Sequence, residues 1–188
     1  MSHNRIDENR AFIAVGFGVI TVSDTRTLEE DRSGDVLASR IAGAGHELRV
    51  RDIVRDEIGA IQTLVREWSR RDDIDAIILT GGTGFTGRDV TPDAIEPLYD
   101  KAMDGFSAIF HRISFEKIGT STIQSRASAG LINQTFVFSI PGSTGACKDA
   151  WDGIFQPQFD YRHMPCNFVE IMPRLDEHLK RGGGAKSL

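Results

Sequence analysis

Apolar side chains along this chain occur in two patterns, short continuous runs and longer stretches with helical spacing. Residues 14–23 form a nearly continuous apolar run rich in valine and isoleucine, which is typical of a strand buried on both faces. Residues 46–54 alternate between apolar and polar positions and predict a less buried strand. Two further strands are predicted over residues 74–80 and 135–140, because each run ends directly at Gly-Gly or at Pro-Gly.

Helical spacing lies between these runs. Over residues 57–71, apolar residues recur three or four positions apart, which predicts an amphipathic helix. Thr91-Pro92-Asp93 has the composition of a helix start, with a capping hydroxyl, a proline at the first helical position and an acid in the first turn. The other predicted helical segments cover residues 33–44, pieces of 91–117, 144–154 and 169–181.

The alternation of strands and helices predicts both the fold class and the place of a ligand site. Successive βαβ units build a mainly parallel sheet with helices on both faces, so we expect an α/β protein. Ligands of such sheets bind beyond the carboxyl ends of the strands. Three loops are expected there, residues 23–32, 81–90 and 141–145.

Length and charge narrow the class of protein. The 188 residues suit a single domain over residues 1–188, with flexible ends expected over residues 1–11 and 182–188. The formal net charge is −5, from 22 Lys and Arg against 27 Asp and Glu. This balance argues against binding to nucleic acid or to a membrane, which usually needs a basic face. An anionic small ligand stays open, since backbone amides, a few arginines and a metal ion can hold phosphate locally.

Cysteine usage and hydropathy indicate a cellular location. Cys147 and Cys166 show no metal-ligand spacing, and two thiols in a chain of this size fit a reducing compartment. The chain has no run of about 18 apolar residues. Its first residues also lack the apolar segment of a signal peptide. We therefore expect a cytoplasmic protein.

The most informative loop begins with Gly81-Gly82-Thr83-Gly84, directly after a predicted buried strand. Glycines let successive backbone N–H groups point into one concavity, which is a common way to bind phosphate oxygens. The alternative is a tight turn from strand to helix that needs glycine only for its geometry. The motif by itself leaves both interpretations open.

Gly82, Gly84 and Gly87 also spell the G-x-G-x-x-G pattern of dinucleotide-binding proteins. The last glycine of that pattern lies inside the helix, whereas here further loop residues separate Gly87 from the predicted helix start at Thr91. The second strand with a terminal acid is also missing, because residues 100–117 are predicted to be helical. A nicotinamide-dependent oxidoreductase is therefore the most distant of the functions considered.

Asp89 is the candidate metal ligand. It lies in the loop just before the predicted helix start and beside the glycine loop. A carboxylate there would repel phosphate unless a divalent cation lies between them, and Mg²⁺ binds through one or two carboxylates together with substrate phosphates. The alternatives are a solvated loop acid or an ion-pair partner of Arg88.

The remaining loops contain small polar side chains with two interpretations each. Ser23 and Asp24 follow a strand end, where they either contact a ribose or base edge or satisfy the turn. Ser143 lies at a predicted helix start, which favours either anion binding or N-capping. Residues 121–126 cluster hydroxyls around Arg126, which either binds phosphate through its guanidinium or is a surface residue.

Taken in order, the loops resemble the MogA/MoaB family. The resemblance covers about residues 12–170 and rests on Thr21-Val22-Ser23-Asp24, Gly81-Gly82-Thr83-Gly84, Arg88-Asp89-Val90-Thr91-Pro92-Asp93-Ala94 and Pro141-Gly142-Ser143. The combination of the glycine loop with the Arg-Asp-Val-Thr-Pro-Asp segment is highly specific. Residues 119–127 and the stretch through 165–168 are similar to the MoaB branch in particular.

This resemblance implies a three-layer α/β/α fold with a mainly parallel, mixed sheet, assembled as trimers or as hexamers made of two trimers. It implies that the protein binds molybdopterin, a pterin dithiolene with a terminal phosphate. In active members that phosphate attacks the α-phosphorus of Mg-ATP, giving adenylylated molybdopterin and pyrophosphate. A family member that binds molybdopterin or a partner enzyme of the same pathway without turnover is the alternative.

Roles for individual residues follow from the resemblance together with the loop chemistry. Asp89 and Asp56 match the functional acids of the family, and Asp89 is also the expected ligand of Mg²⁺. The residues expected to bind the nucleotide are Ser23, Asp24, Gly81, Gly82, Thr83 and Gly84. Those expected on the molybdopterin side are Ser125, Arg126 and Ser143. No protein nucleophile is needed, because adenylyl transfer depends on positioning and charge neutralisation.

Overall fold

The computed structural model of the chain describes residues 5–177. Contacts divide it into two compact units, Ala14–Gln156 and a smaller unit that includes residues 5–13 and 157–177. The predicted tail over residues 182–188 lies outside the described residues, as do the first four residues of the predicted arm. Within the described part, no helix is long and apolar enough to cross a membrane. The expectation of one domain over the whole chain stays a prediction.

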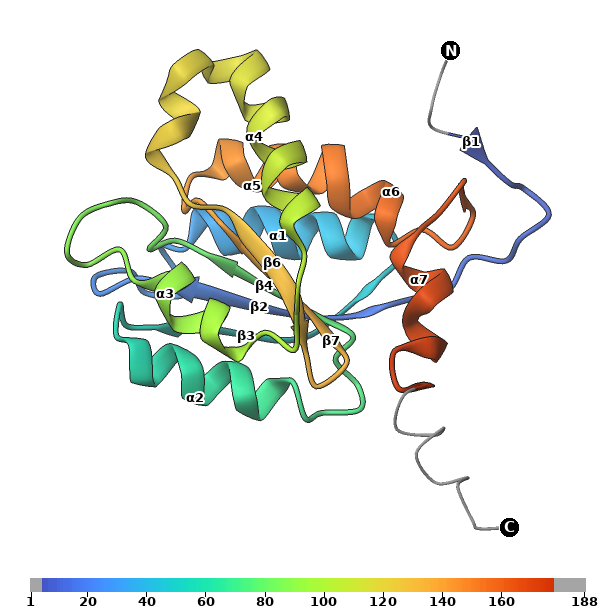
Figure 1. Cartoon of the computed structure of the whole chain (residues 1–188), viewed down its shortest axis with the longest axis horizontal. Coiled ribbons are helices and arrows are strands. Elements are labelled where there is room, and N and C mark those ends of the chain that lie inside the picture. Colours follow the sequence, from blue (N-terminus) through green and yellow to red (C-terminus); the bar gives the residue numbers. More distant parts are fainter. Residues whose placement is uncertain (1–4, 178–188) are drawn as a thin grey trace, which may run out of the picture. The chain divides into compact units, whose positions relative to one another are not determined.

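The larger unit is built on a mixed six-stranded sheet with the strand order β3-β2-β4-β7-β6-β5 (Figure 1). Its strands are β2 (Gly16–Val22), β3 (Glu47–Val54), β4 (Ala76–Thr80), β5 (Lys101–Ala102), β6 (Ser128–Ile132) and β7 (Thr135–Ile140). Strands β3, β2, β4 and β7 run parallel, whereas β6 is antiparallel to β7 and β5 is antiparallel to β6. The mainly parallel sheet expected from the apolar runs is confirmed.

Helices cover both faces of this sheet. Figure 1 shows α1, α4 and α5 on one face and α2 and α3 on the other. The α-helices of the larger unit are α1 (Arg32–Gly43), α2 (Ile58–Trp68), α3 (Thr91–Ile95), α4 (Asp104–Ile118) and α5 (Thr144–Ala150), and α6 (Gln156–Gln158) begins at the last residue of this unit. Shorter helical segments are η1 (Glu96–Leu98), η2 (Gly119–Gln124) and the π-helix η3 (Trp151–Phe155). The arrangement is the expected three-layer α/β/α fold.

Burial on both faces explains the continuous apolar runs. All seven residues of β2 are buried, while the edge strand β3 has no buried residue. On one face Trp68 packs against β2 at Gly18, where an added Cβ would lie 2.8 Å from the indole ring. On the other face the ring of Phe138 contacts those of Phe106 and Phe155, at centroid distances of 5.1 and 4.8 Å. Parallel pairing places the carboxyl ends of β2, β4 and β7 beside one another, and this packing covers both faces of the sheet.

Strands β5 and β6 were not predicted from the sequence. Strand β6 begins with Ser-Ala-Gly, which have low strand propensity. Gly130 is needed there because the ring of Tyr99 lies 2.4 Å from the position of an added Cβ. The turn from β6 to β7 is Asn133-Gln134, with φ of 48° and 69°, a conformation that usually selects Asn-Gly. The hairpin therefore lacked its usual sequence signal.

The predicted helical segment over residues 91–117 is interrupted in the structure. The first helix, α3, ends at Ile95, and Pro97 lies in the 3-10 turn that follows. A proline has no N–H to continue the α-helical hydrogen bonds, so the chain leaves the helix here. It then adds the short edge strand β5 before α4 begins at Asp104.

The smaller unit contains a two-stranded antiparallel sheet of β1 (Arg5–Ile6) and β8 (His163–Met164). It also contains α7 (Phe168–Ile171) and η4 (Met172–Arg174), and Asn167 caps α7 by accepting a hydrogen bond from the Glu170 N–H at 2.8 Å. These segments correspond to the start of the helix predicted over residues 169–181, whose last four residues lie outside the described part.

Candidate functional site

Three loops meet beyond the carboxyl ends of β2, β4 and β7, where the ligand site is expected. Together with Asp56 after β3, Gln124 at the end of η2 and the following Ser125, they line an open cleft of about 660 Å³. Of the residues proposed from the sequence, those that line this cleft are Ser23, Asp56, Gly81, Gly82, Thr83, Gly84, Asp89, Ser125 and Ser143. Asp24 and Arg126 lie beside it and bond to residues of its wall. The fold therefore brings the predicted residues together at one place.

The glycine loop has a backbone conformation that favours glycine, with φ of 109° at Gly81 and 62° at Gly82. Thr91 anchors this loop, because its hydroxyl donates to the Gly81 carbonyl oxygen at 2.8 Å and its N–H donates to the Gly82 carbonyl oxygen at 2.9 Å. Among residues 5–177, the N–H groups of Gly82 and Thr83 have no hydrogen-bond acceptor. The loop therefore brings two available donors to the cleft wall, as a phosphate-binding loop requires.

Thr91 does not cap α3, contrary to the sequence-based interpretation. The N-cap position is Val90, and Thr91 is the first residue of the helix and fully buried. A buried hydroxyl needs a partner, and the glycine loop folds back far enough to offer the Gly81 carbonyl oxygen. The side chain therefore stabilises the loop rather than the helix end.

Asp89 closes a small turn within the same loop. Its carboxylate accepts hydrogen bonds from the Thr86 hydroxyl at 2.6 Å and from the Thr86 N–H at 2.9 Å. The bond from the Thr86 hydroxyl is the main cause that lowers the pKa of Asp89, so the carboxylate is ionised at neutral pH. Arg88, the alternative partner considered for Asp89, binds Asp24 instead at 2.8 and 2.5 Å.

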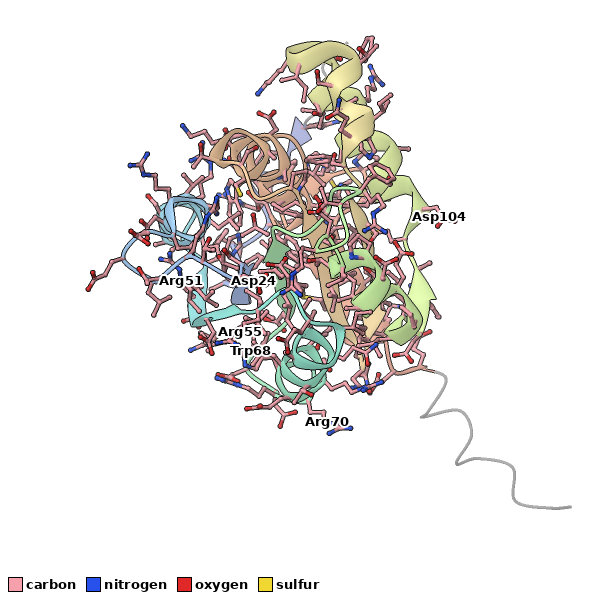
Figure 2. The ribbon with its side chains drawn as sticks, turned by 90° about the vertical axis from the view of Figure 1, so that its left-hand side faces the viewer. Asp24, Arg51, Arg55, Trp68, Arg70 and Asp104 are labelled. Carbon is pink, nitrogen blue, oxygen red and sulfur yellow. The ribbon has the colours of Figure 1, made fainter. Side chains whose placement is uncertain are left out.

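Asp56 and Asp24 bring two more carboxylates to this region (Asp24 is labelled in Figure 2). Burial raises the pKa of Asp56, and the nearby Asp24 carboxylate raises it further. The hydrogen bond from Arg88 lowers the pKa of Asp24, whose other oxygen accepts the Asp56 N–H at 3.2 Å. A cation would relieve this repulsion. Among the described residues no group of three or more His, Cys, Asp or Glu side chains forms a metal site, so an ion here would also need ligand oxygens.

Arg126 is already bound into the wall of the cleft. Its Nε donates to the Gly84 carbonyl oxygen at 3.0 Å, and its Nη1 donates to both carboxylate oxygens of Asp93 at 2.9 and 3.0 Å. Its Nη2 donates to the Asp89 carbonyl oxygen, and its backbone N–H donates to the Thr83 carbonyl oxygen at 2.8 Å. We therefore interpret Arg126 as a residue that positions the loop of Asp89, and its predicted contact with molybdopterin stays a prediction.

The first loop is held by a short turn at Ser23. The Ser23 Oγ accepts the N–H groups of Thr25 and Arg26 at 3.3 and 3.2 Å, so this side chain satisfies the turn. Arg26 lines the cleft, and its Nη1 donates to the Ser33 Oγ at 2.9 Å. No role was assigned to Arg26 or Ser33 from the sequence. The only available signal was the position of Arg26 directly after the turn.

The third loop leads to a second chamber of about 560 Å³ beside the first. Ser143 caps α5 by accepting the Ala146 N–H at 3.1 Å, which supports the capping interpretation. Ser125 donates its hydroxyl hydrogen to the Thr122 carbonyl oxygen at 3.1 Å. The residues common to both chambers are Gln124, Ser125, Pro141 and Ser143. Adjoining chambers of this kind suit two ligands, or one ligand with two distinct parts.

Catalysis by a cysteine thiolate and binding of a dinucleotide find no support at the cleft. The buried Cys147 thiol lies 3.3 Å from the Thr80 hydroxyl, and burial raises its pKa to about 11, so it stays protonated at neutral pH. For dinucleotide binding, Gly87 would have to lie inside a helix, but α3 begins only at Thr91. The expected second parallel strand is also missing, because this stretch forms the two-residue antiparallel strand β5 and then α4.

Comparison with known proteins agrees with this site. A family model described as "Probable molybdopterin binding domain" matches residues 18–161, which include all three loops. The chain is 45% identical over 157 residues to molybdenum cofactor biosynthesis protein B of Escherichia coli K12, covering 84% of this chain and 92% of that protein. It is 48% identical over 141 residues to the protein of the same name from Bacillus subtilis 168, covering 74% and 83%.

Solved structures show the same relationship. A crystal structure of molybdenum cofactor biosynthesis protein B is similar with a TM-score of 0.77 at 40% identity, covering 79% of this chain and 93% of that one. The tungsten cofactor synthesizing protein MoaB from Pyrococcus furiosus has a TM-score of 0.67 at 31% identity, covering 89% and 96%. The resemblance found in the loop motifs is confirmed, and the chain belongs to the molybdopterin-binding-domain family that includes molybdenum cofactor biosynthesis protein B.

Proposed function

We propose that this chain binds molybdopterin and transfers the adenylyl group of ATP to its terminal phosphate. The general role in molybdenum cofactor biosynthesis follows from the family. The observation that supports the finer step is a single loop that combines the available N–H groups of Gly82 and Thr83 with the ionised carboxylate of Asp89. Donors and an acid on one loop suit a phosphate chain that binds together with a cation.

The transfer needs no nucleophile from the protein. An oxygen of the molybdopterin phosphate forms a bond to the α-phosphorus of ATP, and the bond from this phosphorus to the oxygen that bridges to the β-phosphate breaks. Pyrophosphate leaves. The protein contributes by holding the two phosphates in line and by stabilising negative charge on their oxygens. In this cleft the N–H groups of Gly82 and Thr83 would stabilise that charge, while Thr91 keeps their loop in place.

A magnesium ion fits the acids of the cleft. Asp89 is ionised, and the pKa of Asp56 is raised first by burial and then by the neighbouring carboxylates of Asp24 and Asp89. We propose Asp89 as the ligand of the ion and Asp56 as the acid that supports it. When bound, the ion would neutralise charge on the phosphate oxygens of ATP. Arg126 would keep Asp89 in position through the contacts with Gly84 and with the Asp89 carbonyl oxygen.

We place ATP in the chamber of the glycine loop and the pterin in the second chamber. The second chamber, of about 560 Å³, has the size of ordinary small-molecule sites. Ser125 and Ser143 belong to both chambers, so they lie where the terminal phosphate of molybdopterin would approach the nucleotide. This is the role that the family resemblance suggested for the two serines.

The direct experiment is to incubate the purified protein with molybdopterin and Mg-ATP and to measure both products by mass spectrometry. We expect adenylylated molybdopterin and pyrophosphate in equal amounts, and neither product when magnesium is chelated. Molybdopterin binding without product at any ATP or magnesium concentration would favour the non-catalytic family member. Micromolar binding of NAD or NADP with hydride transfer would replace the proposed chemistry by that of an oxidoreductase.

We also infer that copies of the chain assemble into trimers or hexamers. The support is a group of exposed apolar side chains at the end of α4 and on η2, with 56% of Phe115, 56% of Ile118 and 72% of Ile123 exposed. Exposed apolar side chains that lie together commonly mark a surface that binds a partner. Light scattering at micromolar protein concentration should give the mass of a trimer or a hexamer, and a monomer would contradict the inference.

The remaining expectations about partners and location are proposals of the same kind. We propose small-molecule substrates and, beyond further copies of the chain, other enzymes of molybdenum cofactor synthesis as partners. Nucleic acid and membranes are not expected as partners because of the net charge of −5. The cytoplasmic location stays a prediction from the cysteine usage.

A further inference from the structure

Arg26 differs from the other arginine of the cleft wall in its partners. Arg88 is neutralised by the carboxylate of Asp24, which accepts from both Nε and Nη2. Arg26 contacts only neutral oxygens: its Nη1 donates to the Ser33 Oγ at 2.9 Å, and Nη1 and Nη2 lie 3.4 and 3.5 Å from the Gly142 carbonyl oxygen. Among residues 5–177, no carboxylate forms an ion pair with Arg26. Its positive charge is therefore available to a ligand.

The fold holds this guanidinium between the first and third loops. Ser33 is buried in the first turn of α1, and its hydroxyl donates to the Gly142 carbonyl oxygen at 2.7 Å. The Arg26 N–H donates to the Ser23 Oγ at 3.2 Å, which fixes the start of the side chain. The contacts with Gly142 are at the long limit of a hydrogen bond. They are weak enough to be exchanged for bonds to a charged oxygen.

The charges of the cleft identify the chemistry of that ligand. The lining acids are Asp56 and Asp89, so an anionic ligand needs positive charge or N–H donors facing it, and Arg26 supplies both. A guanidinium presents a planar fork of N–H donors that matches two oxygens of one phosphate. We propose that Arg26 binds a phosphate group of the substrates and so adds a phosphate position to that of the Gly82 and Thr83 amides.

The identity of the phosphate rests on the proposed function. Two sources share the same chemistry, namely the β- and γ-phosphates of ATP, which leave as pyrophosphate, and the terminal phosphate of molybdopterin. Arg26 lies beside Gly142 of the third loop, and this loop borders both chambers. The geometry and the proposed substrates together point to a phosphate, and the ligands used in the experiment separate the two sources.

The test measures binding by calorimetry for the wild type, Arg26→Gln, Arg26→Lys and the control Arg70→Gln. Arg70→Gln removes the same charge from the turn after α2 (Figure 2), outside the residues that line the cleft. The probes are inorganic pyrophosphate, AMP and molybdopterin, and thermal unfolding verifies that each variant is folded. We expect Arg26→Gln to weaken the affinity for one phosphate probe by on the order of tenfold or more, with partial recovery in Arg26→Lys. Arg70→Gln should stay within about twofold of the wild type.

The pattern across probes assigns the phosphate. A loss with pyrophosphate but not with AMP points to the departing phosphates of ATP, and a loss with molybdopterin alone points to its terminal phosphate. Equal affinities of wild type and Arg26→Gln for all three probes, or no binding of any probe to the wild type, would overturn the proposal. These experiments measure binding and not turnover. Absence of adenylyl transfer would therefore contradict the proposed function without contradicting phosphate binding by Arg26.

Discussion

Asp89→Asn is expected to lower the rate of adenylyl transfer by on the order of a hundredfold or more, while the affinity for molybdopterin changes little. Asparagine keeps the shape of the side chain and one oxygen for the hydrogen bonds from Thr86, so the loop stays folded. It removes the negative charge that a magnesium ion at the reacting phosphates needs. The pterin lies in the other chamber in our proposal, which is why its binding is spared. Steady-state turnover and molybdopterin calorimetry measure the two effects separately.

The matched control is Asp72→Asn. Asp72 is an exposed acid before β4, at the opposite end of the strand from the cleft, and the substitution removes the same charge. Its turnover should equal that of the wild type. If Asp89→Asn also turns over at the wild-type rate with magnesium saturating, Asp89 has no part in the mechanism. An equal loss of molybdopterin affinity would instead place Asp89 in the binding of the pterin substrate.

Gly81→Ala is expected to lower the free energy of unfolding by about 3 kcal/mol and to weaken ATP binding by on the order of tenfold or more. An added Cβ would lie 2.4 Å from the Val22 carbonyl oxygen, and φ at Gly81 is 109°, which an L side chain rarely adopts. The obstacle is backbone in the buried strand β2, so it cannot move cheaply. Any shift of Gly81 also disturbs its bond with Thr91 and the amides that follow. Urea unfolding and ATP calorimetry measure the two effects.

Gly87→Ala is the control within the same loop. An added Cβ at Gly87 meets no atom within 4 Å, and its backbone is not in the left-handed region. Stability and ATP affinity should therefore stay within about 0.5 kcal/mol of the wild type. A dinucleotide fingerprint would require Gly87 for contact between helix and strand, so a large loss in Gly87→Ala would speak for that interpretation. A tolerated Gly81→Ala would mean that the loop is not the rigid element proposed.

Much of the fold was predictable because its signals are local. The apolar run over residues 14–23 predicted a strand buried on both faces, and the apolar spacing over residues 57–71 predicted the buried side of α2. Strand β6 was not predicted, because its small residues are explained only by the ring of Tyr99, which packs against Gly130. The pairing that makes it a strand comes from its neighbour β7, not from its own propensity.

The candidate site was predictable in its position but not in the contacts of its residues. The glycine loop, Asp89 and Ser125 were expected near one another, since all follow from loops at the carboxyl ends of parallel strands or from the family motifs. Arg126 was expected to bind phosphate, yet its guanidinium is occupied by Asp93 and by carbonyl oxygens of the loop. Whether these residues bind the proposed ligands stays a prediction.

By itself, then, the sequence determined the positions of four strands along the chain, the helical faces and the three loops, because apolar spacing and glycine act within a few residues along the chain. Only the tertiary structure decided which charges neutralise one another. Arg88 lies 64 positions from Asp24, Arg126 lies 33 positions from Asp93, and Arg26 lies 116 positions from Gly142. The partner of each arginine depends on which loops meet in the fold and on which oxygens the guanidinium can reach there. A local sequence pattern contains no information about residues so far apart in the chain. The unpaired charge of Arg26 is a consequence of the same geometry.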